Sequence, residues 1–127
     1  MRNFNRITIM ILILSILLVG CGNNKDKTNE NGKINIVTTT TIIGDAVETI
    51  GGDKVNLEVL MGPGIDPHLY KASAGDMNKM QNADLIIYNG LHLEGKMSDV
   101  LEQMQKSGKN TYAAGDAVDS SRLIESK

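Results

Sequence analysis

The chain has 127 residues, with 13 lysines and arginines, 15 aspartates and glutamates, two histidines and one cysteine. A net charge of -2 without a basic cluster argues against a nucleic-acid partner, and a single cysteine excludes an internal disulfide.

The first 20 residues have the pattern of an export signal. Arg2 and Arg6 precede an uninterrupted apolar run at residues 7–19, which is shorter than the roughly 20 apolar residues that a membrane-spanning helix requires. The run ends in LVGC, which resembles the bacterial lipobox, whose cysteine is lipidated and becomes the mature N-terminus. We therefore predict a lipoprotein signal peptide at residues 1–20, and a lipidated Cys21 that anchors the protein to the extracytoplasmic face of the cell membrane.

A polar segment follows the cysteine. Residues 22–33 are rich in asparagine and lysine and contain no apolar side chain, so we predict residues 21–33 to be a lipidated N-terminus with a disordered tether. Loss of Arg2 and Arg6 with the signal leaves 11 basic against 15 acidic residues, a net charge near -4. One small domain is expected at residues 34–127.

Strand and helix patterns alternate along this domain. Apolar and β-branched runs predict strands at residues 33–41, 55–61, 84–90 and 109–114. Helical periodicity and capping residues predict helices at residues 42–52, 73–83 and 96–108. Thr41 is the expected N-cap of the first helix. The predicted apolar face of this helix holds Ile42, Ile43, Ala46, Val47 and Ile50. Ser73 and Asp76 form an expected capping box at the start of the second helix.

The alternation predicts an α/β fold: an open parallel sheet with flanking helices. In such sheets, ligands bind beyond the carboxyl ends of the strands. The threonines at residues 38–41, the loop GPGIDPHLY at residues 62–70 and the segment NGLHLE at residues 89–94 all follow predicted strands. A binding site is therefore expected at that edge.

His68, in the loop GPGIDPHLY, is the candidate metal ligand. Two prolines and two glycines give this loop a restricted backbone, and neutral imidazole is a common ligand of transition metals. Asp66 and Pro67 are expected to support the loop or the ring. A histidine with a purely structural or surface role fits the residues equally well.

Other side chains near this edge favour ordinary roles. His92 and Glu94 could be further ligands, but a loop histidine and a carboxylate at a helix N-terminus are the better interpretation. The threonines could donate hydrogen bonds to the site or simply favour a strand. No Gly-x-Ser-x-Gly elbow, phosphate-binding loop or zinc-protease helix is present, so we do not expect an enzyme.

Taken together, LVGC, INIVTTTTIIGDAVETIGGDKV and GPGIDPHLYKASAGDMNKMQNADLIIYNGLHLEGKM make the chain resemble the metal-binding lipoproteins of manganese, zinc or iron ABC importers. The resemblance implies a part of the N-terminal lobe of a two-lobed metal receptor with a helical backbone. It also implies that His68 binds the metal and that the remaining ligands lie beyond Lys127. We expect a truncated or fragmentary chain.

The resemblance predicts that the protein captures a divalent cation, manganese or zinc with iron as a further candidate, and delivers it to an ABC transporter permease. The alternative is a lipid-anchored surface adhesin without metal binding. The sequence leaves open which metal is bound, because both manganese and zinc accept histidine and carboxylate ligands. It also leaves open the role of His92 and whether this chain folds or binds metal alone.

Overall fold

The computed structural model describes residues 32–124. The predicted signal peptide, the lipidation site Cys21 and nearly all of the predicted tether lie outside the described residues. Among residues 32–124, no helix has the length and apolar character needed to cross a membrane.

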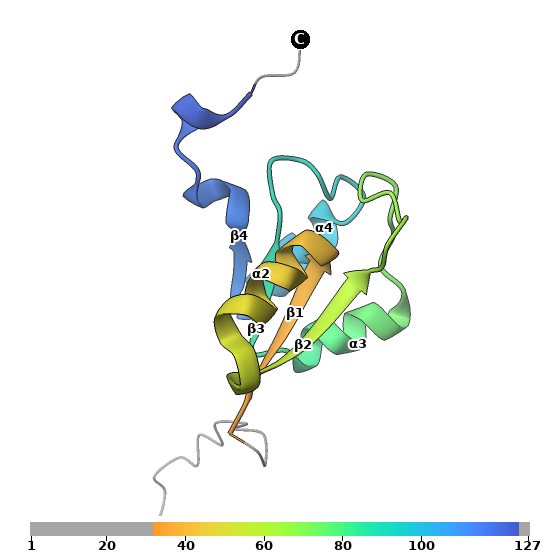
Figure 1. Ribbon diagram of the computed structural model, residues 1–127. Helices are drawn as coiled ribbons and strands as arrows, with labels where there is room; N and C mark the ends of the chain where they lie inside the picture. Colours follow the sequence, from red (N-terminus) through yellow and green to blue (C-terminus); the bar gives the residue numbers. More distant parts are fainter. Residues whose placement is uncertain (1–31, 125–127) are drawn as a thin grey trace, which may run out of the picture.

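Four parallel strands form the single sheet of the described region. They are β1 (Ile34–Thr40), β2 (Val55–Met61), β3 (Leu85–Tyr88) and β4 (Thr111–Ala113), in the order β2-β1-β3-β4. β1 pairs with both β2 and β3, so Thr38 lies between Val59 and Ile87. The strands β1 and β3 are therefore central, and their carboxyl ends lie at the same edge (Figure 1).

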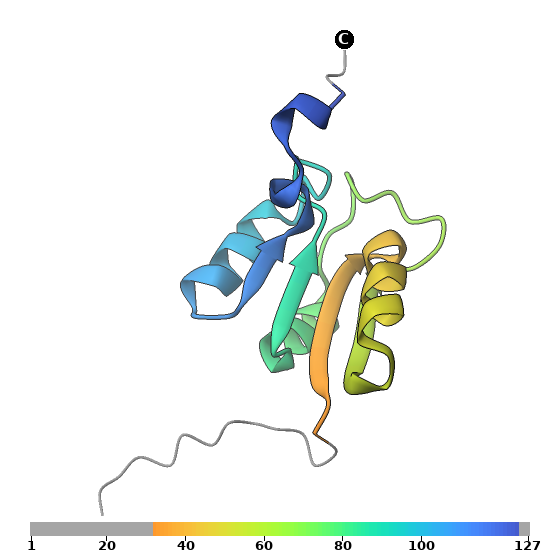
Figure 2. The ribbon, with the colours of Figure 1, turned by 60° about the vertical axis from the view of Figure 1, so that its left-hand side comes forward.

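Helices cover both faces of the sheet. α2 (Thr41–Gly51) lies on one face, and α3 (Ala74–Asn82) and α4 (Ser98–Lys106) lie on the other (Figures 1 and 2). Three short 3-10 turns complete the described chain: η1 (Gly52–Lys54), η2 (Ala114–Ala117) and η3 (Ser120–Arg122). The predicted class, an open parallel sheet with flanking helices, is confirmed.

The hydrophobic core lies on the face covered by α3 and α4. Met80, Ile86 and Met97 are fully buried there. Burying an apolar side chain of this size stabilises a fold by about 1.5–3 kcal/mol relative to exposing it. Met80 in α3 and Met97 at the start of α4 hold both helices against the central strands.

The opposite helix, α2, packs differently from the prediction. Its N-cap is Thr40 rather than Thr41, with Oγ1 of Thr40 accepting a hydrogen bond from the backbone N–H of Ile43 at 3.4 Å. Ile42 and Ile50, expected on the buried face, are 78% and 88% exposed. Gly44 is the buried residue, and a Cβ there would lie 2.8 Å from Cγ2 of Val59. The helix backbone itself approaches the sheet at this glycine, which turns the side chains on the far side of the helix toward solvent.

The capping signals of the other helices were predicted correctly. Ser73 and Asp76 form the capping box that begins α3. Gly108, with a φ of +86°, follows the end of α4 in the left-handed region that favours glycine. The capping box therefore ends the loop that leaves β2, and Gly108 ends α4 before the chain enters β4.

Candidate metal site

The candidate loop leaves β2 through a turn that its sequence requires. The backbone N–H of Ile65 donates to the carbonyl of Gly62 at 3.3 Å, and Gly64 has a φ of +82°. Proline at the second position and a left-handed glycine at the third are the signature of a type II turn. Gly62, Pro63 and Gly64 therefore determine the path of the chain toward the histidine.

A second local motif directs the backbone at His68. Oδ1 of Asp66 accepts a hydrogen bond from the backbone N–H of His68 at 2.9 Å, and the carbonyl of Asp66 accepts one from the backbone N–H of Tyr70 at 3.1 Å. Pro67, between them, holds its own φ near the value that this turn needs. Asp66 thus contacts the backbone of the loop, whereas the sequence left open whether it would orient the loop or the ring.

The ring of His68 contacts a different loop. Its Nδ1 lies 3.0 Å from the carbonyl oxygen of Leu93, in the segment that follows β3. A carbonyl oxygen can only accept, so this contact requires a proton on Nδ1, and in the neutral ring the lone pair is then on Nε2. Because His68 is exposed, Nε2 is the ring nitrogen that a cation could approach. A backbone partner for the other ring nitrogen is the usual arrangement for a metal-binding histidine.

Tyr70 attaches the end of the loop to the body of the domain. Its hydroxyl lies 2.8 Å from Oδ2 of Asp76 and 3.3 Å from the carbonyl of Leu60. Burial, followed by the hydrogen bond and the charge of Asp76, raises the pKa of Tyr70 to about 12. Burial alone would raise the pKa of Asp76, but hydrogen bonds from Ser73 and Tyr70 and the charge of Lys79 together lower it.

Glu94 lies beneath the two loops and is only 3% exposed. Its Oε1 accepts hydrogen bonds from the backbone N–H of Asn89 at 2.6 Å and the hydroxyl of Thr39 at 2.7 Å. Its Oε2 accepts one from the backbone N–H of Gly90 at 3.1 Å. The interpretation of Glu94 as a carboxylate facing a helix N-terminus is therefore wrong, because its oxygens contact the ends of β1 and β3.

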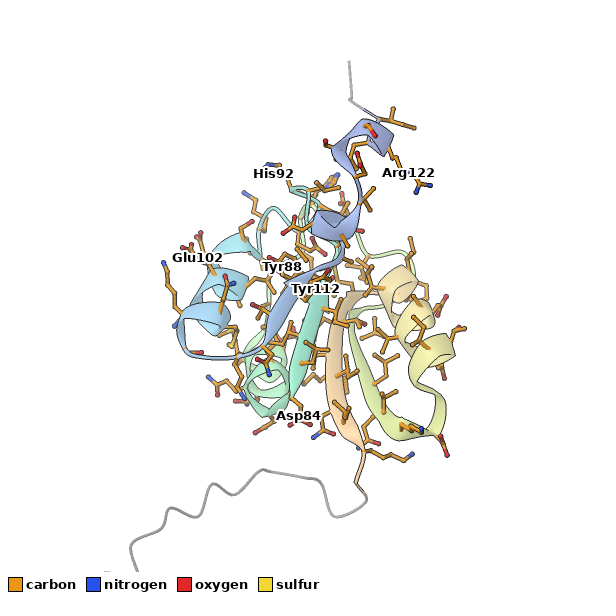
Figure 3. The ribbon with its side chains drawn as sticks, turned by 90° about the vertical axis from the view of Figure 1, so that its left-hand side faces the viewer. Asp84, Tyr88, His92, Glu102, Tyr112 and Arg122 are labelled. Carbon is orange, nitrogen blue, oxygen red and sulfur yellow. The ribbon has the colours of Figure 1, made fainter. Side chains whose placement is uncertain are left out.

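His92 lies in the lining of an open hollow of about 390 Å³ that also includes Glu94, Glu102 and Asp116. Figure 3 shows its side chain at the loop end of the molecule, pointing away from the strands. Within residues 32–124, no group of three or more histidine, cysteine, aspartate or glutamate side chains could hold a metal ion. His68, His92 and Glu94 therefore do not form a joint site in the described region.

Sequence reasoning missed the contact between Leu93 and His68 and the buried position of Glu94. Twenty-five residues separate His68 from Leu93, and a backbone carbonyl leaves no residue-type signal. A weak signal did exist for Glu94. The Asn-Gly pair before it marks a tight turn, and a carboxylate four residues later can accept the N–H groups that such a turn leaves unpaired.

The described region is an α/β lobe with a histidine on a constrained loop at the carboxyl edge of its sheet, the edge at which ligands bind in open α/β sheets. The chain belongs to the ZnuA family, described as zinc-uptake complex component A, periplasmic, whose model matches residues 36–127. The resemblance inferred from the motifs is thereby confirmed.

Three proteins illustrate the similarity of the chain to known members of the family. The manganese-binding lipoprotein MntA of Bacillus subtilis is 44% identical over 114 residues, which cover 90% of this chain and 37% of MntA. The manganese ABC transporter substrate-binding lipoprotein PsaA of Streptococcus pneumoniae is 37% identical over 88% of this chain and 38% of PsaA. The solved structure of the periplasmic zinc-binding protein TroA of Treponema pallidum superposes with a TM-score of 0.71 at 46% identity, covering 76% of this chain and 34% of TroA.

The chain thus spans less than two fifths of the length of these relatives. Their names describe manganese or zinc binding and ABC transport, and the family is a solute-binding family rather than an enzyme family. The names of these three relatives do not mention adhesion, so the adhesin alternative is not favoured.

Proposed function

We propose that this chain is the N-terminal lobe of an extracytoplasmic receptor that captures a divalent cation, manganese or zinc, for an ABC importer. The membership of the ZnuA family supports the class of function, and the manganese and zinc named for its relatives support the cargo. The carrying observation in this chain is the ring of His68, whose Nδ1 contacts the carbonyl of Leu93 and whose Nε2 carries the lone pair.

In this proposal, His68 supplies an imidazole donor at the carboxyl edge of the sheet. Asp66 and Pro67 support the loop, because the Asp66 side chain accepts from the His68 backbone and proline restricts the turn. Further donors come from residues outside the described region, since about four protein ligands are typical of such transition-metal sites. Selection between manganese and zinc depends on those donors and their geometry.

The remaining parts of the proposal concern location and partner. Cys21 is lipidated and holds the receptor on the outer face of the cell membrane, which the lipoprotein names of MntA and PsaA support. The partner is the permease of an ABC transporter, which the name of PsaA supports. The receptor binds and releases the ion without covalent chemistry.

The His68→Ala variant of the complete natural protein tests the proposal. Loss of one imidazole donor is expected to lower the affinity for Mn²⁺ and Zn²⁺ by more than about tenfold. Competition with a chromophoric chelator measures both affinities. His92→Asn is the matched control: it removes the other imidazole, and asparagine tolerates the left-handed backbone at this position, so both affinities are expected to be unchanged. Unchanged affinity in His68→Ala would remove His68 from the site.

A further inference from the structure

We infer that Glu94 is a positioning residue for metal binding. Its buried carboxylate holds the segment of residues 89–95 in the conformation that brings the Leu93 carbonyl to Nδ1 of His68. The inference rests on the proposed role of His68 as a metal ligand and adds the residue that orients its ring. Glu94 acts through the backbone and does not touch the ion.

The segment needs such a support because its backbone is unfavourable. Three successive residues, Gly90, Leu91 and His92, have φ values of +79°, +52° and +64°. Leucine and histidine adopt this left-handed region only when surrounding contacts hold them there. The hydrogen bonds from Asn89 and Gly90 to the carboxylate of Glu94 lie directly before these two residues.

Glu94 also connects the segment to the rest of the sheet edge. The hydroxyl of Thr39, which is fully buried at the carboxyl end of β1, donates to the same oxygen that accepts from Asn89. The carboxylate therefore joins the ends of the two central strands. A buried carboxylate with three donors has a strongly determined position, because losing any donor leaves a buried polar atom unpaired.

Glu94 is directly bonded to the residue whose carbonyl contacts the ring of His68. Leu93, whose carbonyl contacts Nδ1 of His68, immediately precedes Glu94. The backbone N–H of Leu93 also donates to the carbonyl of Gly90 at 3.1 Å, which closes the turn around the left-handed residues. The position of the carboxylate thus determines where the Leu93 carbonyl lies, and the carbonyl determines which ring nitrogen carries the proton.

Direct coordination by Glu94 is not compatible with the structure. Glu94 is 3% exposed, and both of its oxygens already accept hydrogen bonds. Coordination of a cation by either oxygen would compete with the hydrogen bonds that hold Thr39, Asn89 and Gly90.

Glu94→Gln in the complete natural protein is the main test. Glutamine keeps the shape but has one acceptor oxygen, so it cannot accept all three hydrogen bonds. The expected loss of affinity for Mn²⁺ and Zn²⁺ is about 10–100-fold, as for other groups that orient a metal ligand. Glu102→Gln is the matched control, because that carboxylate is exposed on α4 and pairs with Lys106, and it is expected to leave affinity unchanged.

A double-mutant cycle with His68→Ala shows whether Glu94 acts through the ring. In the His68→Ala background, Glu94→Gln is expected to have almost no further effect on affinity. Equal losses in both backgrounds, or wild-type affinity in Glu94→Gln, would overturn the inference. If His68→Ala itself leaves affinity unchanged, the proposed role of His68 as a ligand fails, while the measurement on the ring described next still tests whether Glu94 orients that ring.

The tautomer of His68 provides a readout that a general loss of stability does not change. Long-range ¹H–¹⁵N spectra of the metal-free wild type are expected to show the proton on Nδ1, and those of Glu94→Gln a mixture of tautomers. An unchanged tautomer would contradict the inference. If Glu94→Gln does not fold, Thr39→Val removes one donor while keeping the shape, and it should shift affinity and tautomer in the same direction. A folded Thr39→Val variant with both properties unchanged would also overturn the inference.

Discussion

At the scale of single residues, three side chains with different chemistry hold the candidate loop. Asp66 accepts from the backbone of His68, Glu94 positions the carbonyl that contacts the ring, and Tyr70 joins the loop to Asp76 and Leu60. Their contacts are to the backbone and to the buried side chains of Thr39 and Asp76, so they constrain the loop without supplying a donor to the cation. The loop is therefore largely formed before a metal binds, which lowers the entropy lost on binding.

Tyr70→Phe tests the attachment of the loop. The variant loses the hydroxyl that contacts Asp76 and Leu60. We therefore expect the free energy of unfolding to fall by about 0.5–1.5 kcal/mol at neutral pH. Urea titration followed by circular dichroism measures this difference. Ser73 still donates twice to Asp76 in the variant, so a much larger loss would mean that the ring packs in a way that phenylalanine cannot reproduce.

The same variant has a distinct pH dependence. The folded protein raises the pKa of Tyr70 from 10.0 to about 12, so it favours the protonated hydroxyl. This contribution to stability is fully present below pH 10 and is lost as the pH rises from 10 toward 12. Wild-type stability should therefore fall more steeply than that of Tyr70→Phe across this range. Parallel slopes in urea titrations at several pH values would contradict the assignment.

At the scale of elements, α2 shows that a helix can pack through its backbone rather than through large side chains. Gly44 lies against Val59 and Thr38, and the isoleucines at positions 42 and 50 face solvent in the described chain. The first helix therefore lies close to β1 and β2. The carboxyl ends of the strands remain open for the loops that carry the site.

Gly44→Ala tests this close approach. The added methyl group would lie 2.8 Å from a Cγ of Val59, a stiff β-branched side chain. Overpacking of about 1–3 kcal/mol exceeds the gain in helix propensity, which is at most about 1 kcal/mol, so we expect a net loss of about 1–2 kcal/mol. Thermal unfolding measures it.

Gly75→Ala in α3 is the control for Gly44→Ala. The nearest atom to its added Cβ would be Oγ of Ser73 at 3.5 Å, an ordinary contact, so stability should be unchanged or slightly higher. Equal melting temperatures for the wild type and both variants would mean that α2 does not need the close approach at Gly44.

At the scale of the whole molecule, the parallel sheet gathers every candidate segment at one edge. Thr39, the His68 loop and the segment around Glu94 follow three different strands, and the topology β2-β1-β3-β4 makes their ends neighbours (Figure 1). The ligand set is nevertheless incomplete within residues 32–124, where no cluster of three suitable side chains is found. The proposed function therefore requires further ligands from residues outside the described region.

Residues 21–127 expressed alone test this dependence. With His68 as the main donor, their affinity for Mn²⁺ is expected to be at least about a hundredfold lower than that of full-length MntA of Bacillus subtilis, because such sites use about four ligands. Isothermal titration calorimetry on both proteins, under the same buffer conditions, measures the ratio. Comparable affinities would show that the described lobe holds a complete site that the side-chain geometry does not reveal.

The fold class, the four strands, the capping box of Ser73 and Asp76, and the restricted backbone of the loop with Gly62, Pro63 and Gly64 were readable from the sequence. Each depends on neighbours within a few residues: alternation for strands, a side chain at a helix start, or a residue with restricted φ. The family was readable for the same reason, because its motifs are continuous stretches. The metal-binding role of His68 stays a prediction.

Only the tertiary structure decided which contacts surround His68. The carbonyl of Leu93 is far from it in sequence, and the burial of Glu94 depends on the pairing of β1 with β3. The exposure of Ile42 and Ile50 likewise follows from the close approach of the α2 backbone to β2 at Gly44. Sequence determines local conformation through short-range sterics and hydrogen bonds, whereas contacts between distant segments depend on the space that the assembled sheet leaves between them.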